Sequence, residues 1–515
     1  MNQIGYLIER SSSYYKDDIA VIDHGNGVEY SFRTVNEYSN ALARRLSKLG
    51  LEKGDRIAIM CFNSIEFIVS DFALAKSGLV RVPINPFLAK AEVEYIIRDS
   101  GARCVIFDHQ FTSIISDIQR EKKESLPFLI SNKTNENESI VYSLKEILKN
   151  ESGESFLVET SNEDIYQILY TSGTTGKPKG AIISYKSRLI TINNVLADEL
   201  HIKSGDRMLH MASLSHGSGS KVLPHFVKGA TNVLCRKFSP ELFFQVVEKY
   251  KVTTTFLVPT MIGMLLDYED RTKYDFSSLE TVLYAASPIP KEMLKRALDV
   301  FGPILVQVYA LTEAPNPVLV LSKIDHERSA NSGKILESAG REVTNVRVDI
   351  FDNQDNPVNV NEIGEVVISG EHIMSGYWNN TLATSETIKK GWLYTGDLGY
   401  RDEKGYVFIV GRKKDMVISG GYNVYAREVE DIIYKIEGIH EVAVIGEPDH
   451  KWGEKVVAHL VSNKVTSEEE IINHCKKYLA SYKIPKNIYF HQTLPKNANG
   501  KIDKNKLKER HKINN

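Results

Sequence analysis

Apolar runs of strand length alternate with helical patterns from about residue 28 to residue 410 of this chain. The apolar run Arg56–Met60 predicts a buried strand, and a helix is predicted through residues 66–76. The same order recurs later, with a helix predicted at Pro240–Tyr250 and a strand at residues 253–258. Strands that alternate with helices of this length are typical of parallel sheets covered by helices. We therefore expect an α/β fold of layered sheets.

The pattern changes near Gly364, where short strands follow one another directly. These predicted strands are Glu365–Ser369, Leu398–Arg401 and Tyr406–Val410. The last two are separated by a four-residue turn that ends in glycine, which favours a hairpin. The charged segment Gly411–Asp415 then has little to bury, as is typical of a link between domains. We expect a large N-terminal domain, residues 1–411, that includes this β-rich subdomain, and a C-terminal domain, residues 412–515.

The C-terminal part has the pattern of a small α+β unit. Four apolar side chains recur at the spacing of one helix face: Val429, Ile432, Ile433 and Ile436. Apolar strands are predicted at residues 442–445 and 456–461. Thr466 with Glu469 three residues later predicts a capping box at the start of another helix.

Composition excludes several classes of function. The chain has 515 residues and a net charge of −2, so it lacks the basic field expected of a nucleic-acid-binding protein. Its four cysteines, at positions 61, 104, 235 and 475, have no metal-ligand or redox spacing. The apolar stretch Val252–Leu266 is too short for a membrane span. We expect a cytoplasmic protein with no integral membrane segment.

A loop rich in hydroxyl groups and glycine is the most informative segment. It follows an apolar strand that ends at Tyr170 and contains Thr171, Ser172, Gly173, Thr174, Thr175, Gly176 and Lys177. Glycines let backbone N–H groups surround an anion, hydroxyl groups donate further hydrogen bonds, and lysine adds a positive charge. Pro178 stands where the Walker pattern has Ser or Thr, so this is a different type of phosphate loop.

The string from Tyr170 to Gly180 resembles the signature loop of the adenylate-forming superfamily. This superfamily includes acyl-CoA synthetases, peptide-synthetase adenylation domains and luciferases. Three further segments resemble it in the expected order: Tyr309–Glu313, Tyr394–Asp397 and Pro495–Lys501. The resemblance covers nearly the whole chain and is closest to the acyl-CoA synthetases.

The resemblance implies roles for five residues toward ATP and Mg²⁺. Tyr309 would lie against the adenine, and Thr312 would bond the α-phosphate. Glu313 would help to hold Mg²⁺, a role that suits a hard carboxylate oxygen. Asp397 would accept hydrogen bonds from the ribose hydroxyls, and Arg412 would be a second ribose contact.

The resemblance also implies a C-terminal domain that rotates between two half-reactions, with Lys414 at the hinge. One pose would present Lys501, the expected catalytic lysine, to neutralise charge as the carboxylate attacks the α-phosphate. The other pose would bring Gly420, Gly421 and Tyr422 to the site as the lining of a tunnel for the thiol. The expected C-terminal domain is therefore mobile.

The acyl pocket is predicted from the segment that contains His216 and Gly217. By the resemblance, His216 stands at the pocket mouth, and Gly217 stands where enzymes that activate α-amino acids carry an aspartate. The missing aspartate argues against an amino-acid substrate, while Ala285 and Ala286 leave room for a bulky apolar or aromatic acid. We expect Lys221 to face solvent, although it could pair with a second carboxylate on the acid.

The resulting hypothesis is an ATP-dependent carboxylic acid–CoA ligase of the AMP-forming type. It would use Mg²⁺ and ATP to make an acyl-adenylate, release pyrophosphate, and pass the acyl group to coenzyme A. The alternatives are an adenylation enzyme that loads an aryl or fatty acid onto a carrier-protein phosphopantetheine, and a non-catalytic nucleotide-binding module. The motifs do not identify the acid.

Overall fold

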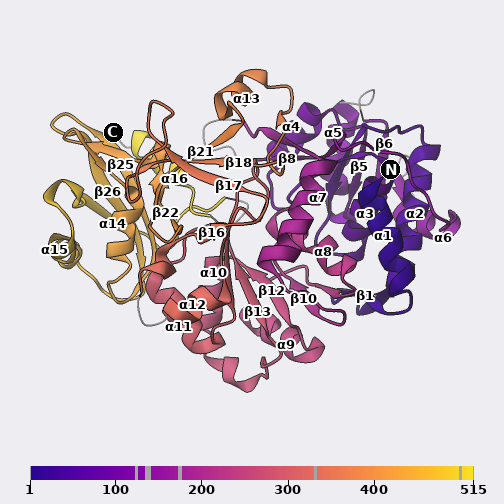
Figure 1. Cartoon of the computed structure of the whole chain (residues 1–515), viewed down its shortest axis with the longest axis horizontal. Coiled ribbons are helices and arrows are strands. Elements are labelled where there is room, and N and C mark those ends of the chain that lie inside the picture. The colour runs from indigo at the N-terminus through magenta and orange to yellow at the C-terminus, as the bar shows by residue number, and fades with distance from the viewer. Residues whose placement is uncertain are drawn as a thin grey trace.

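The computed structural model of the chain describes residues 2–121, 126–133, 141–171, 177–329, 333–497 and 501–513. Four sheets are formed within these ranges, and helices pack between and around them (Figure 1). In Figure 1 the indigo N-terminal elements lie at one end of the molecule, and the yellow C-terminal elements lie at the other. The predicted α/β fold, with a large N-terminal part and a smaller C-terminal part, is confirmed.

A nine-stranded sheet of the described residues carries most of the candidate site, in the order β16-β15-β14-β13-β12-β10-β11-β1-β2. Its strands are β1 (Ile19–Asp23), β2 (Val28–Ser31), β10 (Arg207–His210), β11 (Thr231–Leu234), β12 (Thr254–Leu257), β13 (Thr281–Tyr284), β14 (Leu305–Tyr309), β15 (Leu319–Leu321) and β16 (Arg341–Glu342). The six strands from β14 to β1 pair in parallel, while β2, β15 and β16 add antiparallel edges. The helices that connect or cover these strands are α8 (Val222–Val227), α9 (Pro240–Tyr250), α10 (Pro259–Leu266), α11 (Lys291–Phe301) and α12 (Lys323–Ser329).

A second, eight-stranded sheet has the order β19-β9-β8-β4-β3-β5-β6-β7. Its strands are β3 (Arg56–Met60), β4 (Val80–Pro83), β5 (Cys104–Phe107), β6 (Phe128–Ser131), β7 (Val141–Ser143), β8 (Ile165–Tyr170), β9 (Gly180–Ser184) and β19 (Gly376–Tyr377). The helices of this part are α1 (Gln3–Tyr14), α2 (Phe32–Lys48), α3 (Ile65–Ser77), α4 (Lys90–Ser100), α5 (Thr112–Glu121), α6 (Leu144–Asn150) and α7 (Tyr185–Asn194). Parallel pairing of strands buried on both faces explains why their sequences are continuously apolar rather than alternating.

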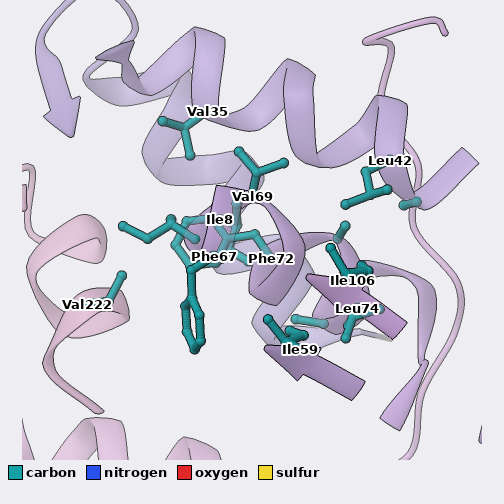
Figure 2. Close-up of a cluster of buried hydrophobic side chains, with 14 of the residues drawn as sticks. Ile8, Val35, Leu42, Ile59, Phe67, Val69, Phe72, Leu74, Ile106 and Val222 are labelled. Carbon is teal, nitrogen blue, oxygen red and sulfur yellow. The ribbon is translucent and has the colours of Figure 1, made fainter. Parts of the chain in front are cut away.

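A buried apolar cluster joins the two sheets. Figure 2 shows Ile8, Phe67 and Phe72 beside Val222 of α8, so helices α1, α3 and α8 share one core. Fully burying a side chain of this size stabilises the fold by about 1.5–3 kcal/mol. The cluster therefore fixes α8, together with the segment that immediately precedes it.

Two smaller sheets complete the structure. The first contains β17 (Arg347–Phe351), β18 (Gly364–Ser369), β20 (Ile388–Lys389), β21 (Trp392–Arg401) and β22 (Val407–Arg412), with α13 (Thr381–Thr387) beside it. The predicted hairpin is present between β21 and β22. The second contains β23 (Val417–Ser419), β24 (Tyr422–Val424), β25 (Ile439–Asp449), β26 (Gly453–Ser462) and β27 (Asn487–Phe490), with helices α14 (Ala426–Ile433), α15 (Glu468–Tyr478) and α16 (Lys504–Ile513).

One predicted helix start is wrong by one residue. Ser467, not Thr466, is the N-cap of α15, and its side chain accepts from the backbone N–H of Glu470 while Glu470 closes the capping box. Among the residues that the structure describes, no helix combines the length and apolar character needed to cross a bilayer.

Candidate active site

The candidate site lies where the parallel strands of the nine-stranded sheet end. The segment of His216 follows β10, Ala285 follows β13, and the loop of Thr312 and Glu313 follows β14. Because the carboxyl ends of parallel strands share one edge of the sheet, the topology brings these segments together. Each of these segments was predicted from its own motif, and the order of the strands in the sheet explains why they lie close together.

The predicted phosphate loop connects β8 to β9. Its neck is closed by two hydrogen bonds: the N–H of Thr171 donates to the carbonyl of Lys179 at 2.9 Å, and the N–H of Lys179 donates to Thr171 Oγ1 at 3.3 Å. The Nζ atom of Lys177 lies 5.7 Å from the centre of the Tyr95 ring, within cation–π range. The predicted residues Ser172, Gly173, Thr174, Thr175 and Gly176 lie outside the described residues.

Tyr377 links the neck of this loop to Glu313. Its ring centre lies 5.1 Å from Lys179 Nζ, and its hydroxyl donates to Glu313 Oε1 at 2.7 Å. The N–H of Met374 donates to the Glu313 carbonyl at 2.8 Å, so this segment holds both the backbone and the side chain of Glu313. Tyr377 was missed in the sequence because an isolated tyrosine carries no recognisable motif.

The loop of Thr312 and Glu313 is closed at its base, where the N–H of Val318 donates to the carbonyl of Tyr309 at 3.0 Å. Both Thr312 and Glu313 are partly exposed in this loop. Among the described residues, Glu313 Oε2 has no protein donor. A free carboxylate oxygen fits Mg²⁺, which keeps several waters and binds through one or two carboxylates plus phosphate oxygens. No group of three or more His, Cys, Asp or Glu side chains gathers elsewhere in the described ranges.

Asp397 is buried, with 4% of its surface exposed, and both of its carboxylate oxygens are held. Tyr309 Oη donates to Oδ2 at 2.7 Å, and Arg412 Nε donates to Oδ1 at 2.8 Å. The β21–β22 hairpin places Asp397 directly opposite Arg412. Desolvation together with the Asp397 charge raises the pKa of Tyr309, which keeps its hydroxyl a donor. The structure therefore brings together three residues that the motifs predicted separately.

Lys501, from the far end of the sequence, lies within electrostatic reach of this cluster. Lys496 and Ile502 form an antiparallel bridge, and the N–H of Asn497 donates to the Lys501 carbonyl at 2.8 Å, so the backbone of Lys501 is held in place. Solvent still reaches its side chain, yet the surrounding protein and the Arg412 charge lower the pKa of Lys501 to about 8. The Asp397 charge acts in the opposite direction.

The side chain of Asn63 forms hydrogen bonds with the backbone of the predicted acyl-pocket segment. Asn63 was not recognised from the sequence. Its Nδ2 donates to the carbonyl of Ala212 at 2.9 Å, and its Oδ1 accepts from the N–H of Leu214 at 2.9 Å. His216 is accessible to solvent, but desolvation and the charge on Lys501 lower the pKa of this imidazole to about 4. His216 is therefore neutral at physiological pH and lies within the electrostatic reach of the candidate catalytic lysine.

Gly217 lies against Phe256 of β12, a second residue without a sequence signal. A Cβ atom at position 217 would lie 2.9 Å from Cζ of this ring, closer than side chains tolerate. Phe256 is buried, with 3% exposed. Its ring therefore occupies the space that a larger residue at position 217 would need.

The expectation that Lys221 faces solvent is wrong. Lys221 is fully buried, and its Nζ lies 2.5 Å from Glu199 Oε1 and 2.6 Å from Glu199 Oε2. Its ammonium also donates to Asn316 Oδ1. A lysine this deep needs charged and hydrogen-bonded partners, because an unpaired charge in a protein interior is costly. Neither partner was recognisable in the sequence.

The predicted thiol-tunnel loop is the turn between β23 and β24. Gly420 and Gly421 have φ values of +60° and +83°, as a two-residue primed turn requires. The N–H of Gly420 donates to the carbonyl of Trp452 at 2.7 Å, and Tyr422 stacks on Tyr482 with ring centres 4.5 Å apart. The contacts found for this loop are with residues of the C-terminal sheet and its loops. Near the predicted hinge, desolvation and the Arg412 charge lower the pKa of Lys414.

Comparison with known proteins agrees with this geometry. A family model described as AMP-binding enzyme matches residues 8–378, and a second, described as AMP-binding enzyme C-terminal domain, matches residues 428–501. A long-chain-fatty-acid–CoA ligase of Mycobacterium tuberculosis is 31% identical over 517 aligned residues, covering 99% of each chain. A feruloyl-CoA synthase of an Amycolatopsis species is 32% identical over 493 aligned residues, covering 95% of each chain.

A solved structure shares the same fold. An amide bond synthetase of Marinactinospora thermotolerans superposes with a TM-score of 0.90 at 25% identity, covering 99% of each chain. Together with the sequence relatives, it confirms the resemblance that the motifs predicted.

Proposed function

The chain belongs to the AMP-binding enzyme family, and from this premise we propose that it is an ATP-dependent carboxylic acid–CoA ligase. In the first half-reaction, a carboxylate oxygen attacks the α-phosphorus of ATP, and the bond to the leaving pyrophosphate breaks. In the second, the thiol of coenzyme A attacks the acyl carbonyl carbon and AMP leaves. The relatives include ligases named for fatty and for aryl acids, so the acid is sought in both classes.

One observation carries this proposal: Lys501 lies within electrostatic reach of the cluster formed by Tyr309, Asp397 and Arg412. Asp397 is the acceptor for the ribose hydroxyls, and Tyr309 and Arg412 orient it by binding one oxygen each. Lys501 is the one member that lies beyond the predicted hinge residue Lys414. We propose that Asp397 is the carboxylate that binds the nucleoside and that Lys501 is a cation that moves with the C-terminal domain.

The cation has a defined task in the first half-reaction. Attack of one anion on another is slow unless positive charge neutralises the oxygens where negative charge develops. We assign this task to Lys501, while Lys177 and the hydroxyl-rich loop bind the phosphates and Thr312 binds the α-phosphate. Glu313, with its free Oε2, would hold Mg²⁺, which when bound neutralises phosphate charge.

The second half-reaction needs a path for the thiol. We propose that the chain divides into residues 1–411 and 412–515, and that the C-terminal domain rotates about Lys414. The loop of Gly420, Gly421 and Tyr422 would then replace Lys501 and line the thiol path. The contacts of this loop with Trp452 and Tyr482 lie within the C-terminal part, which supports the view that the structure corresponds to the pose of the first half-reaction.

Carboxylate-dependent pyrophosphate release from ATP tests this function. Fatty, aryl, dicarboxylic and amino acids are supplied with coenzyme A, with a pantetheinylated carrier protein, or with an amine. We expect release with one class of acid and a thioester only when coenzyme A is present. Product only with the carrier, or an amide only with the amine, would overturn the assignment of coenzyme A. Silence with every acid would favour a non-catalytic module.

A further inference from the structure

The buried Lys221–Glu199 pair lies beside the predicted acyl pocket. Lys221 is four residues after Gly217 in the same segment, and it is followed by α8, which the apolar core of Figure 2 fixes. Both side chains of the pair are 0% exposed. Burying two charges has a large desolvation cost, so such pairs are often retained for specificity rather than for stability.

Asn316 connects this pair to the loop that carries Glu313. It lies three residues beyond Glu313, and its Oδ1 accepts from Lys221 Nζ. Lysine has donors only, so Oδ1 is the atom that must face it, and the NH₂ group must point away. Within the described part of the chain, Asn316 Nδ2 has no protein acceptor, although 9% of the residue is exposed.

An unused amide donor at this place calls for an acceptor from outside the protein. Asn316 contacts Lys221, which ends the segment that begins at Gly217, and it follows Glu313 by three residues, so it connects the predicted acyl-pocket segment to the loop of Glu313. Nδ2 is not fully enclosed by protein, so a molecule in the adjoining space can reach it. An acid that bound there and excluded water would have to supply an acceptor, because a buried donor without one costs free energy.

We propose that Asn316 is a specificity-determining residue that donates a hydrogen bond to an oxygen on the far part of the acid, and that Lys221 and Glu199 position it. The substrate class is therefore acids with a hydroxyl, ether, carbonyl or second carboxylate oxygen away from the reacting carboxylate. This inference rests on the proposed ligase function. Lys221 itself is already paired with Glu199, so it serves as a positioning residue that fixes the carboxamide and does not bind the acid.

The site should prefer an acid that carries an oxygen acceptor for Asn316 over the same acid without that oxygen. With a plain acid, the NH₂ group of Asn316 would lose water without gaining an acceptor, and the site would reject it. One hydrogen bond between neutral groups corresponds to a preference of about fivefold to tenfold in kcat/KM. A second carboxylate would give a charge-assisted bond and a larger preference.

The test compares matched acids in the pyrophosphate-release assay. The pairs are para-hydroxyphenylpropionate against phenylpropionate, terminally hydroxylated hexanoate against hexanoate, and adipate against hexanoate. We expect the oxygenated member of at least one pair to be preferred, and the winning pair identifies a neutral or an anionic oxygen. If the plain acids are preferred throughout, the inference is wrong while the ligase function stands. If no acid releases pyrophosphate, the proposed function itself fails.

Variants separate recognition from general damage. Asn316→Leu should remove the preference by lowering kcat/KM for the oxygenated acid and sparing the plain one, whereas a structural defect would lower both equally. Asn345→Leu is the matched control, since it deletes an asparagine bonded to Asn194 outside the site, and it should leave the ratio unchanged. An unchanged ratio in Asn316→Leu would overturn the assignment.

The positioning role has its own variant. Lys221→Met alone would leave Glu199 buried without a partner and could unfold the protein, so it is combined with Glu199→Gln, which removes both charges. We expect this double variant to fold, as followed by thermal melting. It should lose the preference for the oxygenated acid, because the Asn316 carboxamide can then rotate and exchange the positions of its oxygen and nitrogen. A full wild-type preference in the folded double variant would overturn the positioning role.

Discussion

Deprotonation of Lys501 should switch off acyl-adenylate formation as the pH rises through about 8. An ordinary lysine stays charged to about pH 10, but desolvation and the Arg412 charge lower the pKa of Lys501 to about 8. The charged form is the one that neutralises the developing anion. Activity is therefore present below this pKa and is lost as the pH rises through it.

The size of the effect follows from the pKa. With a pKa of about 8, the charged fraction is about nine-tenths at pH ~7 and about one-tenth at pH ~9, so the rate should fall about tenfold over this interval. A lysine with its ordinary pKa would lose almost nothing over the same range. The assay is acid-dependent pyrophosphate release, recorded as kcat/KM for ATP because this constant reports the free enzyme.

Two controls assign the fall to Lys501. Lys501→Arg keeps its charge at every pH used, so it should be slower overall and independent of pH in this range. Thioester formation from supplied acyl-adenylate should not fall in the wild type. A flat wild-type profile, or the same fall in Lys501→Arg, would refute the reasoning.

Three further perturbations test other parts of the site. Tyr377→Phe removes the hydroxyl that holds Glu313 Oε1, so the Mg²⁺ concentration for half-maximal pyrophosphate release should rise about tenfold, the lower value for one hydrogen bond to a charged group; an unchanged requirement would contradict the assignment of Glu313. Ala286 has a φ of +79°, so Ala286→Gly should raise the free energy of unfolding by about 1 kcal/mol in denaturant titrations, and destabilisation would show that this backbone is unstrained. Gly420→Val introduces a β-branched side chain at a φ of +60°, and its Cβ atom would lie 2.9 Å from Trp452, so it should impair thioester formation about tenfold or more and spare pyrophosphate release; equal loss of both would argue against a thiol-path role.

The parts of the fold that the sequence predicted well are those with strong local signals. The strand Arg56–Met60 and the helix Pro240–Tyr250 have the bounds that their apolar patterns predict. The start of α15 was displaced because both Thr466 and Ser467 have a glutamate three residues later. Tertiary packing of the buried Ile471 and Cys475 sets the register of the helix, and local chemistry does not.

The site was predictable to the extent that its residues stand in motifs. Tyr309, Asp397, Arg412 and Lys501 were found separately, and the fold brings them together. Lys221 was misjudged because its partners are 22 and 95 residues away in the sequence, and a lone lysine is usually solvated. Contacts over such separations depend on the strand order of a whole sheet, which periodicity does not reveal.

The most direct test of the central claim follows the oxygen atoms of the acid. The enzyme is incubated with ATP, Mg²⁺, coenzyme A and a substrate acid in which both carboxylate oxygens are a heavy isotope. The isotope content of each product is then measured by mass spectrometry. Attack on the α-phosphorus predicts one labelled oxygen in AMP, none in pyrophosphate, and an acyl-CoA that retains the other. Label in inorganic phosphate with release of ADP, or unlabelled AMP, would contradict the account.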